Sequence, residues 1–268
     1  MDSVGIIPAR YGSTRFPGKP LTLIAGKPLL AHVIEGARQA ETLKEILVAT
    51  DDERIAEVAE AAGARAIMTD PALPSGTDRT WAALEAAGLT NVDVVVNIQG
   101  DEPLIEGAPL DALVAAFKER PQIEMATLGR EFDLATTEGL EALMSNTTAK
   151  IAVSNDDRAL YFSRFPIPFS RVAAGLAGAA IHKEAVQKSV LKHVGIYAFR
   201  PAFLKRFCSS APCGLEYFEG LEQLRALYLG ATIHVVRTRH ESWGVDTPGD
   251  VEKIESMLKS KQRSDTLS

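Results

Sequence analysis

The first hundred residues alternate between short apolar runs and segments with helical periodicity. A strand that is apolar at nearly every position is buried on both faces, which is typical of a parallel sheet covered by helices. The pattern therefore predicts an α/β fold with a mostly parallel central sheet and helices on both faces. The predicted strands are 4–9, 45–50, 66–68 and 92–99, and the predicted helices are 29–40, 52–62 and 78–87.

The second half of the chain is less regular. No internal repeat and no linker divides it from the first half, so we expect a single domain, with a less ordered excursion at 165–190. The predicted strands are 125–128, 149–154, 195–199 and 233–238, and the predicted helices are 201–207, 215–229 and 248–260.

Composition and charge exclude several classes of protein. With a formal net charge of -6, the chain lacks the basic face of a general nucleic-acid binder. No apolar stretch approaches the roughly 20 residues of a membrane span. Cys208 and Cys213 form a poor zinc motif and suit a reducing compartment, so we expect a cytoplasmic protein.

A purely cationic loop follows the first predicted strand. Residues 3–34 contain Arg10, Arg15, Lys19 and Lys27 and no acidic residue. The carboxyl edge of a parallel sheet is where ligands bind, and three of these cations can offset the roughly four negative charges of a nucleoside triphosphate. The loop matches neither the P-loop nor the dinucleotide motif, so it is either another kind of phosphate site or a solvated basic turn.

Two aspartates are candidate ligands for a divalent cation. Asp101 follows the predicted strand 92–99 and emerges at the same sheet edge as the basic loop, where it either holds a hard cation or caps a turn. Near the C-terminus, Thr247 suits a helix N-cap and Asp250 the acidic half of a capping box. That arrangement leaves Asp246 able to face outward as a second ligand.

Carboxylates also follow the second predicted strand. Asp51 and Asp52 directly precede the predicted helix 52–62, and both residue types are favoured at helix starts. We interpret them as a helix N-cap pair.

Two segments are candidates for binding a base or a sugar. The turn at 74–79 precedes a helix, and its N–H groups, Ser75 and Arg79 either contact a pyrimidine or form a simple cap. At 193–197, the period of two places His193 and Tyr197 on one face across a glycine. His193 is therefore either a ligand-binding or a structural histidine.

These segments together resemble one family. The motifs, in order, are IPARYGSTRFPGKPL (7–21), VATDD (48–52), SGTDR (75–79), NIQGDEP (97–103), YFSR (161–164), HVGIY (193–197), LEQLR (221–225) and GVDTP (244–248). They are similar to those of the 3-deoxy-manno-octulosonate cytidylyltransferases, or CMP-Kdo synthetases, over residues 4 to about 258.

The resemblance implies a nucleotidyltransferase-type, Rossmann-like α/β fold with a smaller sub-lobe. It implies one domain over 1–268, with a CTP-binding half at about 1–120. A sugar-acid-binding and dimerisation part at about 121–240 is then inserted before a closing segment at 241–260. The implied substrates are CTP and 3-deoxy-D-manno-octulosonate (Kdo), the cofactor is Mg²⁺, and the chain is a cytoplasmic homodimer that serves lipopolysaccharide biosynthesis, without nucleic acid or membrane insertion.

The resemblance also assigns roles to single residues. Catalytic roles fall to Arg10, Arg15, Lys19, Asp101 and Asp246, of which the two aspartates hold the metal. CTP contacts fall to Ala9, Ser75, Gly76 and Arg79. Sugar-acid contacts fall to Gln99, Arg164, His193, Tyr197, Glu222 and Gln223.

The implied reaction is direct displacement at the α-phosphorus of CTP, because no arrangement of side chains suggests a covalent nucleophile. Three alternatives remain open. The sugar acid is 8-amino Kdo or sialic acid; the chain is a metal-dependent glycosyltransferase; or it is a nucleotide-sensing module without catalysis.

Overall fold

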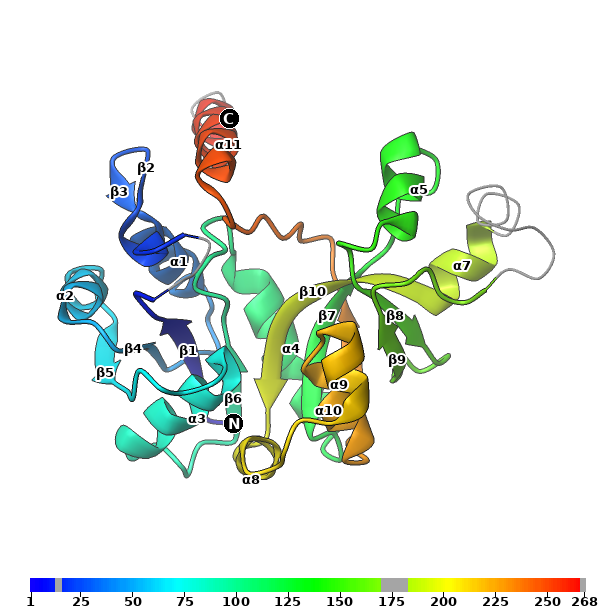
Figure 1. Cartoon of the computed structure of the whole chain (residues 1–268), viewed down its shortest axis with the longest axis horizontal. Helices are drawn as coiled ribbons and strands as arrows, with labels where there is room; N and C mark the ends of the chain where they lie inside the picture. The colour runs from blue at the N-terminus through cyan, green and yellow to red at the C-terminus, as the bar shows by residue number, and fades with distance from the viewer. Residues whose placement is uncertain (13–15, 170–182, 266–268) are drawn as a thin grey trace. The chain divides into compact units, whose positions relative to one another are not determined.

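The structure, a computed structural model, describes residues 1–12, 16–169 and 183–265. It divides into unit 1, which is Met1–Val114 with Ser242–Ser268, and unit 2, which is Ala115–Glu241. Figure 1 draws unit 1 in blue to green with a red C-terminal helix, and unit 2 in green to orange. Each unit is described by itself.

Unit 1 is built on a parallel sheet whose strands are apolar and buried. The strand order is β6-β1-β4-β5, and each neighbouring pair is parallel. The strands are β1 (Ser3–Ala9), β4 (Glu45–Thr50), β5 (Arg65–Met68) and β6 (Val94–Asn97). All four predicted strands of the first half are therefore confirmed, with differences of one or two residues at their ends.

Helices cover both faces of this sheet. The chain moves in one direction from β1 to β4 to β5 and then crosses back to β6, and right-handed crossovers place α3 on the face opposite α1 and α2. In agreement with this, α1 packs on α2, and α3 packs on β1 and β4. The elements are η1 (Lys19–Leu21), β2 (Leu23–Ile24), β3 (Lys27–Pro28), α1 (Leu29–Ala37), α2 (Glu53–Ala61), α3 (Gly76–Ala86), α4 (Gly107–Glu119) and α11 (Pro248–Asp265).

Unit 2 is built on a mainly antiparallel sheet of order β11-β7-β10-β8-β9, in which β7 and β11 pair in parallel. Phe162, Phe199 and Phe207 are fully buried in its core. The strands are β7 (Met125–Arg130), β8 (Lys150–Val153), β9 (Ala159–Ser163), β10 (Val190–Phe199) and β11 (Ile233–Arg237). The helices are α5 (Thr137–Met144), α7 (Lys183–Ser189), α8 (Pro201–Cys208), α9 (Gly214–Glu219) and α10 (Gln223–Tyr228).

Two predictions for unit 2 need correction. The strand expected at 195–199 is present but begins earlier, at Val190. The single helix expected at 215–229 is two helices, because Gly220 takes a left-handed φ of 62° and ends α9. Glu216 and Glu219 therefore lie on a different helix from Gln223, and Tyr228 is 70% exposed.

The mostly parallel, helix-covered sheet of unit 1 agrees with the α/β class expected from sequence. Among the described residues, no helix has both the length and the apolar character needed to cross a membrane. Residues 170–182 of the excursion expected at 165–190 lie outside the described part of the chain.

Candidate active site

The carboxyl ends of β1 and β6 meet at a cavity of about 270 Å³ in unit 1. The start of α3, the start of η1 and the segment before α11 complete its wall. The lining residues are Pro8, Ala9, Arg10, Lys19, Pro20, Leu73, Pro74, Ser75, Gly76, Arg79, Gln99, Gly100, Asp101 and Asp246. The cavity thus collects the residues proposed from sequence for CTP, with Gln99 and both candidate metal ligands.

A glycine places the Asp101 turn against β1. A Cβ atom on Gly100 would lie 2.7 Å from the carbonyl oxygen of Pro8, closer than real Cβ contacts come. The backbone after β6 can therefore approach the end of β1 only because residue 100 has no side chain. This close approach brings Asp101 to the edge of the sheet where the basic loop begins.

Lys19 joins the two carboxylates. Its Nζ lies 2.7 Å from Oδ2 of Asp101 and 3.8 Å from Oδ1 of Asp246. Asp101 and Asp246 are 145 positions apart in the sequence (246 − 101) and still face one cation. The arrangement offers two carboxylates to a single positive charge, and carboxylate oxygens are among the ligands that a hard divalent cation prefers.

The segment that carries Asp246 is tied to the Asp101 turn. The N–H of Val245 donates to the carbonyl of Asp101 at 2.9 Å. The hydroxyl of Ser242 donates to the buried carboxylate of Glu102. These two contacts hold the closing segment beside the turn, and sequence reasoning assigned no role to Ser242 or Glu102.

The start of α11 confirms part of the expected capping box. The carboxylate of Asp250 accepts from the N–H of Thr247 at 2.8 Å and from the N–H of Asp246 at 3.0 Å. The backbone N–H of Thr247 is the main reason that the pKa of Asp250 lies below its usual value. The hydroxyl of Thr247 donates to the same carboxylate, so Asp250 fixes the backbone of Asp246.

The basic loop is only partly described. Arg10 is exposed at the cavity, and Lys19 lies at its floor beside Asp101. Arg15 falls outside the described residues, as do Ser13 and Thr14. The cationic character of the cavity therefore rests here on Arg10, Lys19 and Arg79.

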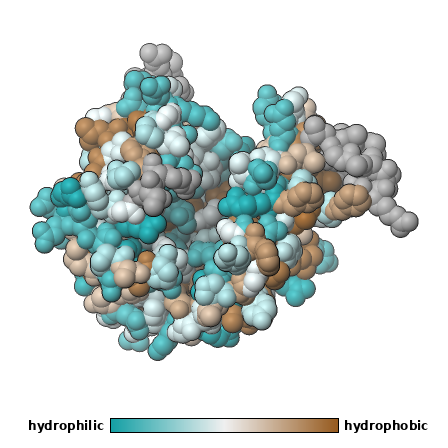
Figure 2. Space-filling view, in the orientation of Figure 1, coloured by the Kyte–Doolittle hydropathy of each residue, from teal (hydrophilic) through white to brown (hydrophobic). Residues whose placement is uncertain are grey.

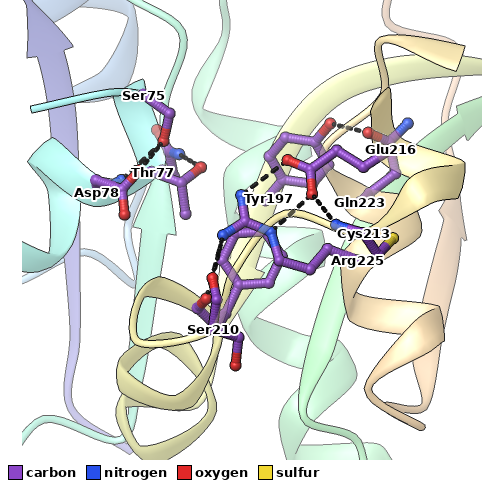
Figure 3. Close-up of polar contacts among 11 residues, drawn as sticks. Ser75, Thr77, Asp78, Tyr197, Ser210, Cys213, Glu216, Gln223 and Arg225 are labelled. Carbon is purple, nitrogen blue, oxygen red and sulfur yellow. Dashed lines mark hydrogen bonds and ion pairs between the residues drawn. The ribbon is translucent and has the colours of Figure 1, made fainter. Parts of the chain in front are cut away.

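The turn before α3 is a helix cap that also lines the cavity. The hydroxyl of Ser75 accepts from the N–H of Asp78 at 3.0 Å and donates to its carboxylate at 2.6 Å (Figure 3). Gly76 begins the helix at the cavity wall. The capping interpretation is confirmed, and it leaves the first turn of α3 facing the cavity.

Arg79 is almost fully buried, at 2% exposure of its side chain, behind the cavity wall. Its Nη1 donates to Oγ1 of Thr69 at 2.6 Å, and its Nη2 lies 3.4 Å from Oδ2 of Asp51. Burial lowers the pKa of Arg79, and the nearby Asp51 opposes that shift. Asp51 is thus the counter-ion of a buried cation.

Asp51 and Asp52 have different roles, so the expected N-cap pair is half right. Asp52 caps α2 by accepting from the N–H of Arg54 at 3.0 Å. Asp51 instead binds Arg79 and the N–H of Tyr11. Asp51 directly follows β4 and Asp101 lies four residues after the end of β6, so the same sheet-edge argument would have identified both.

In unit 2, His193 and Tyr197 lie on one side of β10 with ring centroids 5.5 Å apart. Gln223 joins them: its Oε1 accepts from the Tyr197 hydroxyl at 3.1 Å (Figure 3), and its Nε2 lies 3.4 Å from Nδ1 of His193. Apart from its two chain neighbours, no described residue has a heavy atom within 4 Å of a Cβ built on Gly195, so the space beside this glycine is open.

The hydrogen bonds of His193 fix its charge state. Because Nδ1 faces the amide N–H₂ of Gln223, it acts as the acceptor, and Nε2 then carries the proton toward Thr127 Oγ1 at 3.0 Å. The Thr127 hydroxyl donates onward to the carbonyl of Ile196 at 2.9 Å. Burial, with Arg164 as a further cause, lowers the pKa of His193 to about 3. The imidazole is therefore neutral at physiological pH.

Glu219 and Lys150 hold the backbone around Arg164. The Glu219 carboxylate accepts from the Arg164 N–H at 2.8 Å and from the Ser163 hydroxyl at 2.7 Å. The fully buried ammonium of Lys150 donates to the carbonyls of Ser145, Thr148 and Arg164, and burial lowers its pKa to about 8. Neither Glu219 nor Lys150 was among the functional residues proposed from the sequence.

A buried ion pair sets the angle between α9 and α10. Arg225 binds both carboxylate oxygens of Glu216, at 2.8 and 2.9 Å, and also the carbonyl of Ser210 at 3.0 Å (Figure 3). Glu222, at the start of α10, and Gln223, buried beside it, therefore stand on a helix whose position is fixed by Arg225.

We predict that His193 makes the stability of the protein depend on pH. Its pKa is lower in the folded than in the unfolded protein, so its contribution is complete above about 6.5 and is lost as pH falls toward 3. The free energy of unfolding should fall by up to about 1.4 kcal/mol per pH unit in this window. Urea unfolding at pH 4 to 7 measures the slope, and a His193→Gln variant that keeps the wild-type slope would contradict the assignment.

Comparisons with known proteins agree with this geometry. The family model described as "Cytidylyltransferase" matches residues 4–233. The 3-deoxy-manno-octulosonate cytidylyltransferase of Bdellovibrio bacteriovorus is 47% identical over 97% of this chain and 99% of the relative. The 8-amino-3,8-dideoxy-manno-octulosonate cytidylyltransferase of Shewanella frigidimarina is 42% identical over 94% and 97%.

Solved structures give the same result. The structure of CMP:2-keto-3-deoxy-manno-octonic acid synthetase complexed with CTP has a TM-score of 0.84 at 37% identity and covers 97% of this chain and 100% of that one. The resemblance to the CMP-Kdo synthetases is therefore confirmed, and the chain belongs to the cytidylyltransferase family.

Proposed function

We propose that this protein transfers the cytidylyl group of CTP to Kdo and releases pyrophosphate. The observation that carries the proposal is the cavity of unit 1, where cationic side chains and two carboxylates face one another at the edge of a parallel sheet. The names of the relatives and of the solved CTP complex support the choice of both substrates.

The cationic residues are assigned to the triphosphate. Arg10 and Lys19, with Arg15 from the same loop, neutralise its phosphate oxygens and stabilise the charge that develops on the leaving pyrophosphate. Ala9, Ser75, Gly76 and Arg79 are assigned to the nucleoside, since they line the wall around the start of α3.

The carboxylate pair fits Mg²⁺. The contacts of Lys19 with Asp101 and Asp246 support the proposal that both carboxylates would hold one cation. No group of three His, Cys, Asp or Glu side chains suited to a metal occurs among the described residues, so phosphate oxygens and water complete the ligand set. When bound, Mg²⁺ reduces the repulsion between the triphosphate and the acidic substrate.

The polar cluster of unit 2 is assigned to the sugar acid. Arg164 offers a guanidinium to the carboxylate, and Tyr197, Glu222 and Gln223 offer groups to the hydroxyls. The neutral His193 acts as a hydrogen-bonding group rather than as a cation. Gln99 is assigned to a sugar hydroxyl from its place in the cavity of unit 1.

The reaction is a direct displacement. The anomeric hydroxyl of the sugar acid loses its proton to solvent, and its oxygen forms a bond to the α-phosphorus of CTP. The bond from that phosphorus to the bridging oxygen breaks, and pyrophosphate leaves with that oxygen. We further propose that the product serves lipopolysaccharide synthesis in the cytoplasm, a reducing compartment that suits the free thiols of Cys208 and Cys213.

The assay incubates CTP, UTP and ATP each with Kdo, 8-amino Kdo and sialic acid and measures the release of pyrophosphate. We expect release only when CTP, Kdo and Mg²⁺ are present together. Higher kcat/KM with 8-amino Kdo would reassign the sugar acid. Release of a nucleoside diphosphate would indicate a glycosyltransferase, and binding without turnover would indicate a sensing module.

Asp101→Asn and Asp246→Asn should each lower kcat by at least about 100-fold, because each removes one charged metal ligand. The fold should persist, since both side chains are partly exposed. Asp93→Asn is the matched control, because it changes a carboxylate near the other end of β6. Turnover of either variant within a few-fold of the control would refute the role of that aspartate.

We also propose that the chain forms a homodimer through an aromatic patch of unit 2, made of Phe165, Phe169, Tyr217 and Phe218. These side chains are 70–87% exposed, and solvent-exposed aromatic groups of this size mark interaction surfaces. Bonds from Glu219 to Ser163 and to the Arg164 N–H hold the end of α9 against the segment that follows β9. Figure 2 shows hydrophobic surface in the region of α9.

Phe218→Glu should convert the dimer to a monomer, because it places a charge in the buried centre of the interface. Tyr228→Glu, at an exposed aromatic residue outside the patch, should leave the dimer intact. Sedimentation velocity measures both, and a wild-type monomer, or a Phe218→Glu variant that sediments as the wild-type dimer, would contradict the proposal.

A further inference from the structure

A backbone hydrogen bond of Tyr11 joins the two ends of the basic loop, residues 11 and 18. Tyr11 stands two residues after β1, and its carbonyl accepts from the N–H of Gly18 at 3.0 Å. Arg10 and Lys19 are the residues immediately outside this closure. The position of Tyr11 therefore fixes the backbone next to Arg10 and, through Gly18, the backbone next to Lys19.

Asp51 holds the backbone of Tyr11. Its Oδ1 accepts from the Tyr11 N–H at 3.1 Å, across 40 positions of sequence. The ring of Tyr11 packs below the guanidinium of Arg54, which lies 4.0 Å from the ring centroid, and reaches the backbone of Gly18 on the other side of the loop. The start of the loop is thus fixed by one hydrogen bond and by two packing contacts.

The same carboxylate holds Arg79. Its Oδ2 lies 3.4 Å from Nη2 of Arg79, whose side chain is almost fully buried and lines the cavity. A buried guanidinium needs a nearby anion, because desolvation is costly when the charge is unpaired. Asp51 therefore connects the closure of the loop with the wall of the cavity, although it is not itself among the described lining residues.

We propose that Asp51 is a positioning residue for CTP, which acts through Tyr11 on the phosphate-binding loop and through Arg79 on the nucleoside side. The proposal rests on the proposed function of the cavity. This role differs from a general contribution to folding. One carboxylate oxygen of Asp51 acts on the triphosphate side of the site and the other acts on the nucleoside side.

Two substitutions at this position separate the two contacts. In Asp51→Asn the amide oxygen still accepts from the Tyr11 N–H, but the negative charge beside Arg79 is lost. In Asp51→Ala both contacts are lost. Glu53→Gln is the matched control, because it removes an exposed carboxylate two residues away in the first turn of α2 and leaves both oxygens of Asp51 in place.

The readout is the ratio of the affinities for CTP and CMP, measured by calorimetry with Mg²⁺ on the intact chain. CMP lacks the phosphates that the basic loop would bind. Asp51→Asn should weaken both nucleotides by similar factors and keep the ratio. Asp51→Ala should lower the ratio by about tenfold, the effect expected when one backbone donor loses its partner. Glu53→Gln should keep the wild-type values.

Kinetics give a second readout. In Asp51→Ala the KM for CTP should rise while the KM for the sugar acid stays within about twofold, which a general loss of stability does not produce. If Asp51→Ala does not fold, Arg54→Gln at an exposed position tests the same closure by removing the cation above the Tyr11 ring, and it should lower the ratio by about threefold.

The outcomes separate the two hypotheses. Wild-type protein that binds CTP no more tightly than CMP would refute the proposed function of the cavity. Wild-type protein with the expected preference, combined with an unchanged ratio in Asp51→Ala, or in Arg54→Gln where the alanine variant does not fold, would overturn the role of Asp51 alone.

Discussion

The cavity of unit 1 depends on bringing two carboxylates to one cation at the edge of a sheet. Asp101 and Asp246 repel each other, and the ammonium of Lys19 between them offsets that repulsion. The arrangement requires Gly100 at its close approach to Pro8, and it requires the contacts that tie Val245 and Ser242 to the Asp101 turn. Residues from three distant parts of the chain thus form one electrostatic site.

Local pattern predicts most of unit 1, because its strands are apolar on both faces and leave little ambiguity. The strand predicted at 45–50 has the bounds of β4, and the N-cap predicted at Asp52 is observed. The helix α4 was missed, although Leu110, Leu113, Val114 and Phe117 have helical spacing and are buried. Gly107 and Pro109 at the start of α4 are residues typical of a turn, which hides the helix in the sequence. Pro is nevertheless tolerated in the first turn of a helix.

The errors in unit 2 arise where tertiary contacts decide the structure. The pattern at 215–229 is compatible with one helix, and what divides it is the left-handed Gly220 together with the pairing of Arg225 and Glu216. Arg225 and Glu216 are nine positions apart in the sequence, and the rule that pairs helical charges three or four residues apart does not describe such a pair. In the same way, the buried Lys150 and the bonds of Glu219 depend on carbonyl and hydroxyl groups that only the fold brings near.

Two aspartates that each follow a strand of the parallel sheet show how burial decides the role of a carboxylate. Asp51 follows β4 and Asp101 follows β6, so sequence position alone gives both the same prospect of reaching a ligand. The Asp51 side chain is 11% exposed and both of its oxygens are bound by Tyr11 and Arg79, whereas that of Asp101 is 31% exposed and faces Lys19 at the cavity. A carboxylate whose two oxygens are bound inside the protein holds other groups in place, and one that is partly exposed at the cavity remains accessible to solvent. The different roles of Asp51 and Asp101 at this sheet edge therefore follow from how far neighbouring backbone covers the turn that carries each of them.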